Sequence, residues 1–492
     1  MCGVCGIWSP ESQARNDPAE AARLMFFSLY ALQHRGQESA GLAATDGRDL
    51  RVVRRMGLVG QVFSEPDLGV LSGRAAMGHT RYSTTGSSKI QNAQPFVVRD
   101  DDLGELAIGH NGNCINAKDL RDDLAGRGVS FVTSSDTEVV AQAMANAPGA
   151  SWDERIVNAL PHLAGAWSLV MLTPGALYAV RDPLGVRPLC LGRKGGAWLV
   201  ASETCALETI GAEFIREVAP GEVLRIDDRG PVPIGDLAAD RRGLCIFEHV
   251  YLASASSRLG GVSVYATRER MGEILAREHP AEADAVIPVP DSAIPAAVGY
   301  ARQSGIPFHE GLIKNRYIGR TFIQPSDELR RHNVALKYNA LSDVLEGKRV
   351  VVVDDSIVRG NTSGPIVELL RRHGAREVHM RICSPPIRHS CYFGVDMARR
   401  SELIASKLSV EEIRRHIGAD SLGYLSLAGM IGATGGTADE YCAACFTGEY
   451  LVPVQLELEK SVLEKPSDER GGRGPRSASD SERDRAEASA KK

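Results

Sequence analysis

The chain has 492 residues, which is too long for a single hydrophobic core, so we expect two or three domains. Hydrophobic residues make up 43% of the chain and charged residues 24%, proportions typical of a soluble globular protein. The net charge of −5 and the lack of a basic stripe argue against nucleic acid as a partner.

Cysteine content and apolar runs indicate the compartment. Ten cysteines are too few for a disulfide scaffold in a chain of this length, which favours reduced thiols and a cytoplasmic location. No basic segment followed by an apolar stretch opens the chain, and apolar runs such as residues 168–172 are far shorter than a membrane span. We therefore expect a cytoplasmic protein with no membrane partner.

The chain begins with Met1 and Cys2. The small second residue favours removal of the initiator methionine, which would leave Cys2 as the N-terminal residue. Its α-amino group, with a pKa of about 8, could then act as the base for its own thiol. A cysteine after the initiator methionine usually has no function, so this pair needs support from its surroundings.

Short alternating apolar segments, separated by turn residues, continue to about residue 235 and predict antiparallel strands. The clearest of them are residues 75–80, 106–110, 176–180 and 197–201. Helical patterns near residues 18–33 and 136–147 interrupt these strands, and Ser135 gives the second helix a plausible capped start. Helices packed on a mostly antiparallel sheet predict an α+β fold for this half.

From about residue 265 the pattern changes to strands that alternate with helices. The predicted elements are a strand at 285–290, a helix at 296–305, a strand at 350–353, a helix that ends at 373 and a strand at 378–382. Such alternation predicts an α/β domain with a mainly parallel sheet.

Residues 349–362 are the most informative stretch of the chain. Four consecutive valines, 350–353, predict a strand buried on both faces, and Asp354 and Asp355 follow at the end where such sheets bind ligands. The following loop and helix start can bind a phosphate through N–H groups, while the carboxylates face ribose hydroxyls and Mg²⁺. From the acidic pair alone, an ordinary strand that ends in polar residues is the alternative.

Two cysteine pairs have the CxxC spacing. Cys442 and Cys445 suit a redox pair, a zinc half-site or an iron–sulfur half-site. Cys2 and Cys5 suit a redox or zinc role, but a buried, inert Cys5 is the stronger expectation because free cysteine behaves as a small hydrophobe.

The last part of the chain predicts disorder, because residues 466–492 contain no Ile, Leu, Val, Met or aromatic side chain. We therefore expect a first domain at residues 2–235, a second at 236–460 and a disordered tail at 461–492.

Five blocks of the first half resemble the class II glutamine amidotransferases, which are N-terminal-nucleophile hydrolases with a four-layer αββα fold. The blocks are residues 3–8, 32–41, 78–84, 109–113 and 135–138. The resemblance implies that Cys2 attacks the glutamine side-chain amide, and that Asn111 and the Gly112 N–H form the oxyanion hole. It also implies that Arg81 holds the substrate α-carboxylate and that Asp136 pairs with the α-ammonium group. A surface ion pair or a helix cap is the ordinary interpretation of these two residues.

Residues 349–362 resemble the 5-phosphoribosyl-1-pyrophosphate (PRPP) motif of type I phosphoribosyltransferases. The implied PRPP-binding residues are Asp354, Asp355, Ser356, Arg359, Gly360 and Thr362. The resemblance places Ser292 near Mg²⁺ beside the two aspartates, with a turn or helix cap as an equal alternative. Lys314 and Arg316, in a segment that matches the family's flexible loop, are expected to contact the pyrophosphate leaving group. A solvated basic loop is the other interpretation of this pair.

The surroundings of Cys245 and Cys391 resemble the amidophosphoribosyltransferases that carry a [4Fe–4S] cluster. The implied ligands are Cys245, Cys391, Cys442 and Cys445, in a structural role, with zinc as the second candidate. The other cysteines, Cys114, Cys190, Cys205 and Cys383, are expected in the core. Residues 252–257 depart from a family stretch that reads Phe-Ala-Arg-Pro-Asp-Ser, which puts in doubt the contact made there beside the cluster.

The resemblance covers residue 2 to about 457 and implies an enzyme that opens de novo purine synthesis. Glutamine, Mg²⁺-bound PRPP and water would give 5-phosphoribosylamine, glutamate and pyrophosphate, with ammonia channelled between the two sites. Purine nucleotide feedback inhibitors and a homo-oligomer, usually a tetramer, are further expectations from the family.

Two other functions remain open. The first is a different class II amidotransferase, such as a glucosamine-6-phosphate or asparagine synthase. The run of residues 350–362 argues against both of these enzymes. The second is a non-catalytic regulator that keeps phosphoribosyl binding. It is opposed by the set Cys2, Arg81, Asn111, Gly112 and Asp136.

Overall fold

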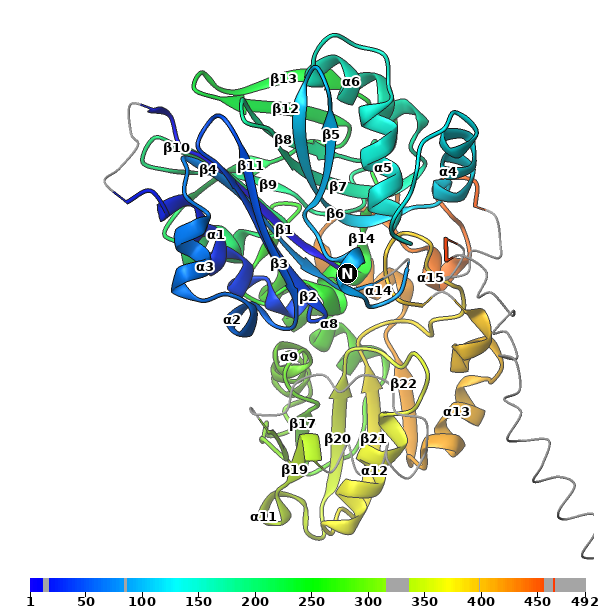
Figure 1. The fold of residues 1–492 in the computed structure, drawn as a ribbon. Helices are drawn as coiled ribbons and strands as arrows, with labels where there is room; N and C mark the ends of the chain where they lie inside the picture. The colour runs from blue at the N-terminus through cyan, green and yellow to red at the C-terminus, as the bar shows by residue number, and fades with distance from the viewer. Residues whose placement is uncertain (12–16, 84–85, 316–335, 398, 455–462, 465–492) are drawn as a thin grey trace, which may run out of the picture.

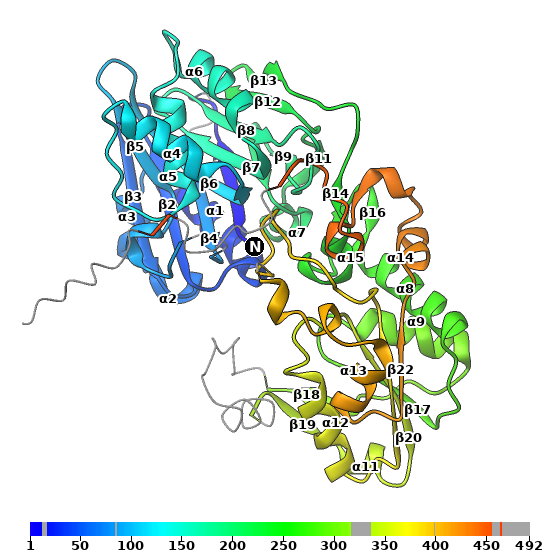
Figure 2. The ribbon, with the colours of Figure 1, turned by 90° about the vertical axis from the view of Figure 1, so that its right-hand side faces the viewer.

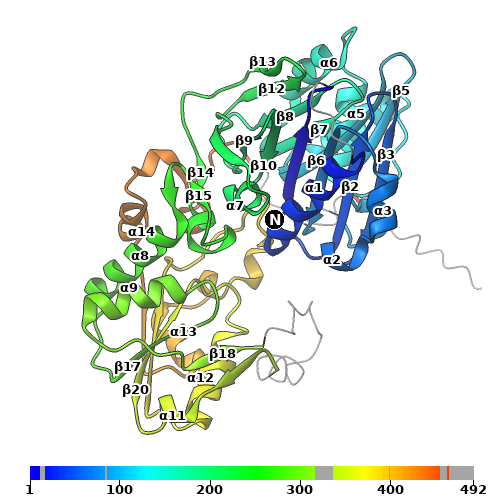
Figure 3. The ribbon, with the colours of Figure 1, turned by 90° about the vertical axis from the view of Figure 1, so that its left-hand side faces the viewer.

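The structure is a computed structural model that describes residues 1–11, 17–83, 86–315, 336–397, 399–454 and 463–464. The chain forms an upper body and a lower body in Figure 1, and its amino terminus lies at the junction between them in all three views (Figures 1, 2 and 3). The predicted tail at 461–492 falls almost entirely outside the described residues. None of the described helices combines the length and the apolar character that crossing a membrane requires.

The upper body contains two antiparallel sheets. The first has the order β11 (Glu213–Glu217), β9 (Cys190–Lys194), β10 (Ala197–Ala201), β1 (Gly3–Trp8), β4 (Ala75–Arg81), β2 (Ser39–Thr45), β3 (Leu50–Met56). The second has the order β13 (Gly230–Asp236), β12 (Glu222–Asp227), β8 (Leu177–Arg181), β7 (Gly165–Leu172), β6 (Gly104–Cys114), β5 (Phe96–Asp100).

Helices cover the outer faces of both sheets (Figure 1). On the first sheet lie α1 (Glu20–Ala31), α2 (Val59–Val62), α3 (Glu65–Val70) and α7 (Thr204–Thr209). On the second lie α4 (Ala117–Gly126), α5 (Asp136–Ala145) and α6 (Trp152–Ala159). Short helical turns occur at η2 (Gln33–Arg35), η3 (Ile90–Asn92) and η4 (Leu160–His162).

Strand β1 shows why the four layers form. Its side chains alternate, so Cys5 and Ile7 pack against the helices of the first layer, whereas Val4 and Trp8 pack between the two sheets. Each layer boundary therefore has its own apolar core. The predicted αββα sandwich is confirmed, and so is the predicted burial of Cys5 on a strand.

The lower body is built on a parallel sheet with the order β17 (Ala285–Pro288), β20 (Arg349–Asp354), β21 (Glu377–Ile382), β22 (Ser421–Tyr424). Helices α8 (Val264–Glu278) and α9 (Ile294–Ser304) lie on one face, and α12 (Ser363–Arg372) and α13 (Val410–Ile417) lie on the other (Figures 2 and 3). In β20, Val351 and Val353 enter the first of these cores while Val350 and Val352 enter the second, which confirms the predicted two-sided burial.

Smaller elements complete the structure. The strand pairs are β14 (Leu244–Cys245) with β23 (Tyr441–Cys442), β15 (Arg258–Leu259) with β16 (Val262–Ser263), and β18 (Leu312–Lys314) with β19 (Tyr338–Ala340). The remaining helices and turns are η5 (Glu248–Leu252), α11 (Ser342–Leu345), η6 (Arg400–Glu402), η7 (Ile404–Ser406), α14 (Leu427–Thr434), η8 (Ala438–Glu440) and α15 (Ala444–Thr447). Strand β13 ends at Asp236, next to the predicted domain boundary, which stays a prediction.

Candidate active site

Cys2 lies at the entry to β1, buried at the junction of the two bodies. Its backbone N–H donates to Asn111 Oδ1 at 3.2 Å, and its carbonyl accepts from Arg35 Nε at 3.0 Å. The Tyr82 N–H donates to the Cys2 sulfur at 3.5 Å. Burial raises the pKa of the Cys2 thiol, whereas the positive amino terminus, the bond to Tyr82 and the Arg81 charge oppose that increase. The thiol therefore needs a nearby base to ionise.

Asn111 and Gly112 lie beside this thiol on β6. The Asn111 side chain is fully buried, and within the described part of the chain its Nδ2 has no hydrogen-bond partner. Gly112 has φ +148°, and a Cβ there would lie 2.0 Å from the Ala166 carbonyl oxygen, so only glycine fits. A buried amide donor left open next to a nucleophile is suited to stabilising a negative oxygen in a transition state.

Arg81 and Asp136 are both buried, with 2% and 4% of their surfaces exposed. Arg81 ends β4, and its Nη1 lies 3.3 Å from Glu38 Oε2. Asp136 begins α5 and accepts a hydrogen bond of 3.0 Å from the Cys114 N–H. The cap of this helix is Ser135, whose Oγ accepts from the Thr137 N–H, so the interpretation of Asp136 as a helix cap is wrong. The interpretation as a surface ion pair is also wrong, because both side chains are buried.

The second candidate site lies at the C-terminal end of β20. Asp354 and Asp355 are 7% and 9% exposed, and Ser292 Oγ donates to Asp355 Oδ2 at 2.5 Å. Burial, followed by the charge of Asp355, holds the pKa of Asp354 well above its usual range. Ser292 thus contacts the acidic pair, and α9 has no side-chain cap. Two clustered carboxylates and a hydroxyl form an oxygen-rich set suited to a hard divalent cation.

The loop after β20 brings the other predicted residues to the same end of the sheet. Ser356 Oγ donates to Asp355 Oδ1 at 2.6 Å, and Gly360 adopts φ +74°. The Thr362 hydroxyl does not cap α12, which leaves the helix start open to an anion. Arg359 forms an ion pair of 2.6 Å with Glu402.

The predicted pyrophosphate contacts are only partly described. Lys314, the last residue of β18, is partly exposed and forms an ion pair with Asp291. Arg316 lies outside the described residues.

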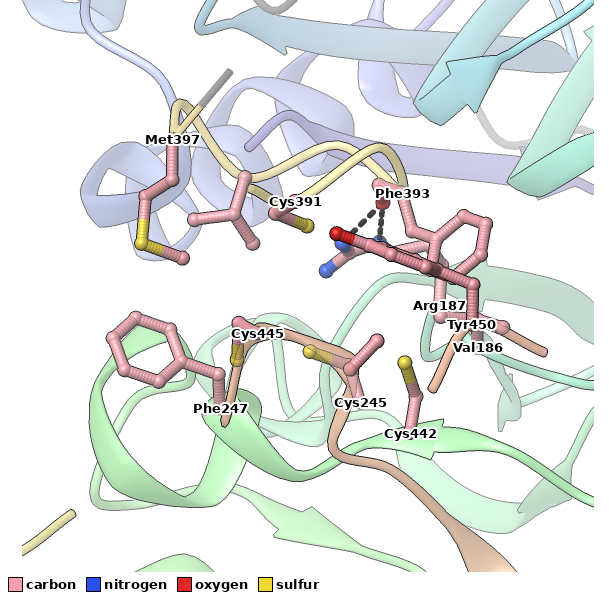
Figure 4. A pocket seen from close by; sticks show the side chains of 12 residues that line it. Val186, Arg187, Cys245, Phe247, Cys391, Phe393, Met397, Cys442, Cys445 and Tyr450 are labelled. Atoms are coloured by element: carbon pink, nitrogen blue, oxygen red, sulfur yellow. Dashed lines mark hydrogen bonds between the residues drawn. The ribbon is translucent and has the colours of Figure 1, made fainter. Parts of the chain in front are cut away.

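The four predicted cysteine ligands come from separate parts of the chain and line one pocket (Figure 4). Cys245 on β14 lies opposite Cys442 on β23, and Cys445 lies in α15. Cys391 belongs to an irregular segment after β21. All four are free thiols. The other pocket residues are Val186, Arg187, Phe247, Phe393, Val395, Met397, Ala444 and Tyr450.

Burial raises the pKa of the Cys245 thiol to about 11 and that of Cys442 to about 12, so both are neutral without a bound group. Arg187 opposes the shift at both thiols and would compensate charge if they ionised. Within the described ranges, no three His, Cys, Asp or Glu side chains are placed to share a single metal ion. The sulfurs therefore surround the pocket and do not meet at one point.

Buried charges join the two bodies near Cys2. Arg35 pairs with Glu203 and with Glu248, and all three side chains are fully buried. Ser254 N and Ser257 Oγ donate to Glu203 Oε2 at 2.8 and 2.7 Å, so the divergent stretch 252–257 contacts this network. Arg35 lies in the motif block 32–41, but no role was predicted for it. The signal that could have identified it is a charged residue inside a block that resembles the family.

Comparison with known proteins agrees with both halves of this arrangement. Residues 79–209 match a glutamine amidotransferase domain, and residues 266–384 match a phosphoribosyl transferase domain. The chain is 49% identical over 464 residues to the amidophosphoribosyltransferase of Archaeoglobus fulgidus, which covers 93% of this chain and 99% of the relative. The Bacillus subtilis amidophosphoribosyltransferase is 46% identical over 473 residues, with coverage of 94% and 98%.

Solved structures give the same result. A glutamine PRPP amidotransferase from Bacillus subtilis, in complex with ADP and GMP, superposes with a TM-score of 0.86 at 45% identity. The match covers 92% of this chain and 98% of that structure. A structure described as the allosteric regulatory enzyme of purine biosynthesis has the same TM-score and identity, with coverage of 92% and 97%.

Proposed function

The chain belongs to the amidophosphoribosyltransferase family, and from this premise we propose which residues perform each half of the reaction. The enzyme converts glutamine, PRPP and water into 5-phosphoribosylamine, glutamate and pyrophosphate, the first step of de novo purine synthesis. The phosphoribosyl transferase domain excludes the other class II amidotransferases considered above. One observation carries the residue assignment: the Cys2 N–H donates to Asn111 Oδ1, while the buried Asn111 Nδ2 has no partner among the described residues and is available as a donor.

Glutamine hydrolysis is assigned to Cys2. After removal of Met1, the α-amino group takes the thiol proton, and the sulfur bonds to the side-chain carbonyl carbon of glutamine. Asn111 Nδ2 and the Gly112 N–H donate to the negative oxygen. The C–N bond breaks, ammonia leaves with the transferred proton, and water hydrolyses the thioester to glutamate. Arg81 binds the substrate α-carboxylate and Asp136 its α-ammonium group. The burial of both residues, the action of the Arg81 charge on Cys2 and the bond of Asp136 to β6 support these roles.

PRPP binding is assigned to the end of β20. The ribose hydroxyls face Asp354 and Asp355, and the 5-phosphate lies against the loop of Ser356, Arg359, Gly360 and Thr362 at the start of α12. Lys314 and Arg316 neutralise the pyrophosphate as the bond from C1 to oxygen breaks and ammonia attacks C1.

Mg²⁺ is assigned to Ser292, Asp354 and Asp355. This set fits a divalent cation, because burial and the negative charge of Asp355 raise the pKa of Asp354, and a bound positive charge would oppose both effects. Mg²⁺ would supply positive charge to the pyrophosphate leaving group.

The four cysteines are assigned as ligands of a [4Fe–4S] cluster, with zinc as the alternative. A zinc ion with sulfurs at about 2.3 Å needs four thiolates in close contact. Here the thiols surround a pocket and share no single ion position within the described part of the chain, which favours a larger, polynuclear group. Iron and acid-labile sulfide analysis of the anaerobically purified protein tests this choice, and stoichiometric zinc without sulfide would reverse it.

Three further proposals follow from the family. Ammonia passes from Cys2 to C1 of PRPP through the junction, where free ammonia is kept from water and from protonation. Purine nucleotides inhibit by feedback, in line with the ADP and GMP of the Bacillus subtilis complex. The protein is a homo-oligomer, for which a tetramer is the proposal, and its ten unpaired thiols favour the cytoplasm.

The decisive experiment measures coupling. Native protein with glutamine, PRPP and Mg²⁺ should release glutamate and pyrophosphate in equal amounts, and its N-terminal mass should lack Met1. Glutamate release in excess of pyrophosphate at saturating PRPP would refute channelling. A retained Met1 in active enzyme would refute the α-amino base.

A further inference from the structure

Residues 391–397, here called the Cys391 segment, lie between the four-cysteine pocket and the glutamine site. On one side, Cys391, Phe393, Val395 and Met397 line the pocket (Figure 4). On the other side Gly394 touches β6. A Cβ added to Gly394 would lie 2.9 Å from the carbonyl carbon of Gly112 and 3.0 Å from its Cα and oxygen. The backbones of these two glycines are therefore in direct contact.

The same segment makes two more contacts next to the nucleophile. Asn113 Nδ2 donates to the Tyr392 carbonyl oxygen at 3.0 Å. The Tyr82 hydroxyl donates to Asp396 Oδ2 at 3.4 Å, and the Tyr82 backbone bonds the Cys2 sulfur. The Cys391 segment thus meets β6 and the loop after β4 together.

The pocket side of the segment is anchored by hydrogen bonds and by Cys391 itself. Arg187 Nε donates to the Phe393 carbonyl oxygen at 2.7 Å (Figure 4). Tyr450 Oη donates at 2.8 Å to the carbonyl oxygen of Ser390, the residue just before the segment. The Cys391 N–H donates to the Met397 carbonyl oxygen at 3.1 Å, which closes the segment on itself. A group bound by Cys391 would add a covalent attachment to the three other cysteine-bearing elements.

Gly112 is held from two sides. Behind it lies β7, where the Ala166 oxygen leaves no room for a side chain, and in front of it lies Gly394. The direction of a peptide N–H inside such contacts depends on both neighbours, because packed backbones cannot deform independently. Gly394 contacts the Cα and the carbonyl group of Gly112, and the Gly112 N–H is attached to the same Cα. Displacement of Gly394 would therefore let the Gly112 backbone rotate and redirect that N–H.

We propose that Gly394 is a positioning residue for glutamine hydrolysis. By packing on the Cα and carbonyl group of Gly112, it fixes the backbone rotation that points the Gly112 N–H at the oxyanion. The Cys391 segment carries this restraint from the four-cysteine centre, so the occupancy of that centre sets the order of the glutamine site. This inference rests on the proposed roles of Cys2 and Gly112.

The test is Gly394→Ala, with Gly418→Ala as the matched control. Both glycines have left-handed φ angles, +100° and +74°, but a Cβ at Gly418 meets no atom of the described residues within 4 Å. Gly394→Ala should lower kcat with glutamine by about tenfold or more, since a misplaced oxyanion donor weakens transition-state binding. Its KM for glutamine, its ammonia-dependent rate and its iron content should match those of Gly418→Ala. A glutamine-dependent kcat equal to that of the control would overturn the inference.

A second variant guards against misfolding of the first. Asn113→Ala removes the bond to Tyr392 without adding volume, and should lower kcat with glutamine in the same direction by a smaller factor. An unchanged kcat would count against the inference. Wild-type enzyme without any glutaminase activity would instead refute the proposed function, so the two failures are distinguishable.

Amide hydrogen exchange tests, without an activity assay, whether the four-cysteine centre restrains the backbone around Gly112. Peptides that cover residues 109–114 should exchange faster in Cys391→Ser than in wild-type protein, whereas peptides over β20 should not change. Equal protection of residues 109–114 in both proteins would show that the four-cysteine centre does not order the glutamine site.

Discussion

The two candidate sites differ in how completely the chain builds them before a substrate arrives. Around Cys2, the functional side chains are buried and held by neighbouring layers of protein. At the end of β20, Asp354 carries a strongly raised pKa, and Thr362 is exposed. The site around Cys2 is therefore preorganised by packing, whereas the site at the end of β20 needs bound ligands to balance its negative charges.

The largest expected effect is at the nucleophile. Cys2→Ala should reduce glutamine-dependent synthesis by on the order of 10⁴-fold or more, because no other group can form the thioester. Synthesis from added ammonium chloride should continue, since the PRPP site is in the other body. Loss of both activities, measured as pyrophosphate release, would show that the two sites do not work separately.

The second effect concerns the junction. Arg35→Met should lower the free energy of unfolding by about 3–5 kcal/mol, because it leaves the buried Glu203 and Glu248 carboxylates without their shared cation. Arg23→Met is the matched control, since its ion pairs with Asp17 and Glu65 are at the surface and should contribute little. Urea unfolding measures both, and equal midpoints would contradict the structural role of the network.

The third effect concerns Asn111 and distinguishes stabilisation of the transition state from binding of glutamine. Asn111→Ala should lower kcat with glutamine by about 10²–10³-fold, the usual effect of losing one oxyanion donor. KM should change little, because the donor acts on charge that develops in the transition state. Asn158→Ala, at the surface, is the control. A rise in KM with unchanged kcat would place Asn111 in substrate binding only.

The smallest effect tests the charge imbalance of the PRPP site. The pKa of Asp354 is higher in the folded protein than the unfolded value of about 3.9. Folding therefore costs free energy at this carboxyl once the pH rises above about 3.9, because the unfolded state ionises more easily. At neutral pH, Asp354→Asn should raise the melting temperature by a few degrees while weakening Mg²⁺-dependent PRPP binding. Asp343→Asn, an exposed residue on α11, should change neither. A lower melting temperature for Asp354→Asn, seen by calorimetry, would contradict this account.

Much of the fold follows from short-range patterns. Alternation predicted β10 at residues 197–201 and β8 within one residue of its observed start. The four valines of 350–353 predicted a strand with two buried faces, because β-branched side chains on both faces need cover on both sides. The helix near 18–33 was predicted slightly longer than the observed Glu20–Ala31.

Contacts between residues that are distant in the chain could not be predicted from the sequence. Glu248 pairs with Arg35 across 213 positions and with Arg187 across 61, and no local pattern links these residues. The divergent stretch 252–257 raised a question that only its hydrogen bonds to Glu203 could answer. The backbone contact of Gly394 with Gly112 is likewise invisible in either motif.

Residue patterns predicted several of the strands and helices, the two-part architecture and the candidate functional side chains. These depend on periodicity and residue type, which are local properties. The atoms that meet at the junction became known only from the fold: the Asn111 amide beside Cys2, the four thiols around one pocket, and Gly394 packed against Gly112. Such meetings depend on how packed layers fit together, and close packing over long sequence separations leaves no periodic signal in the chain.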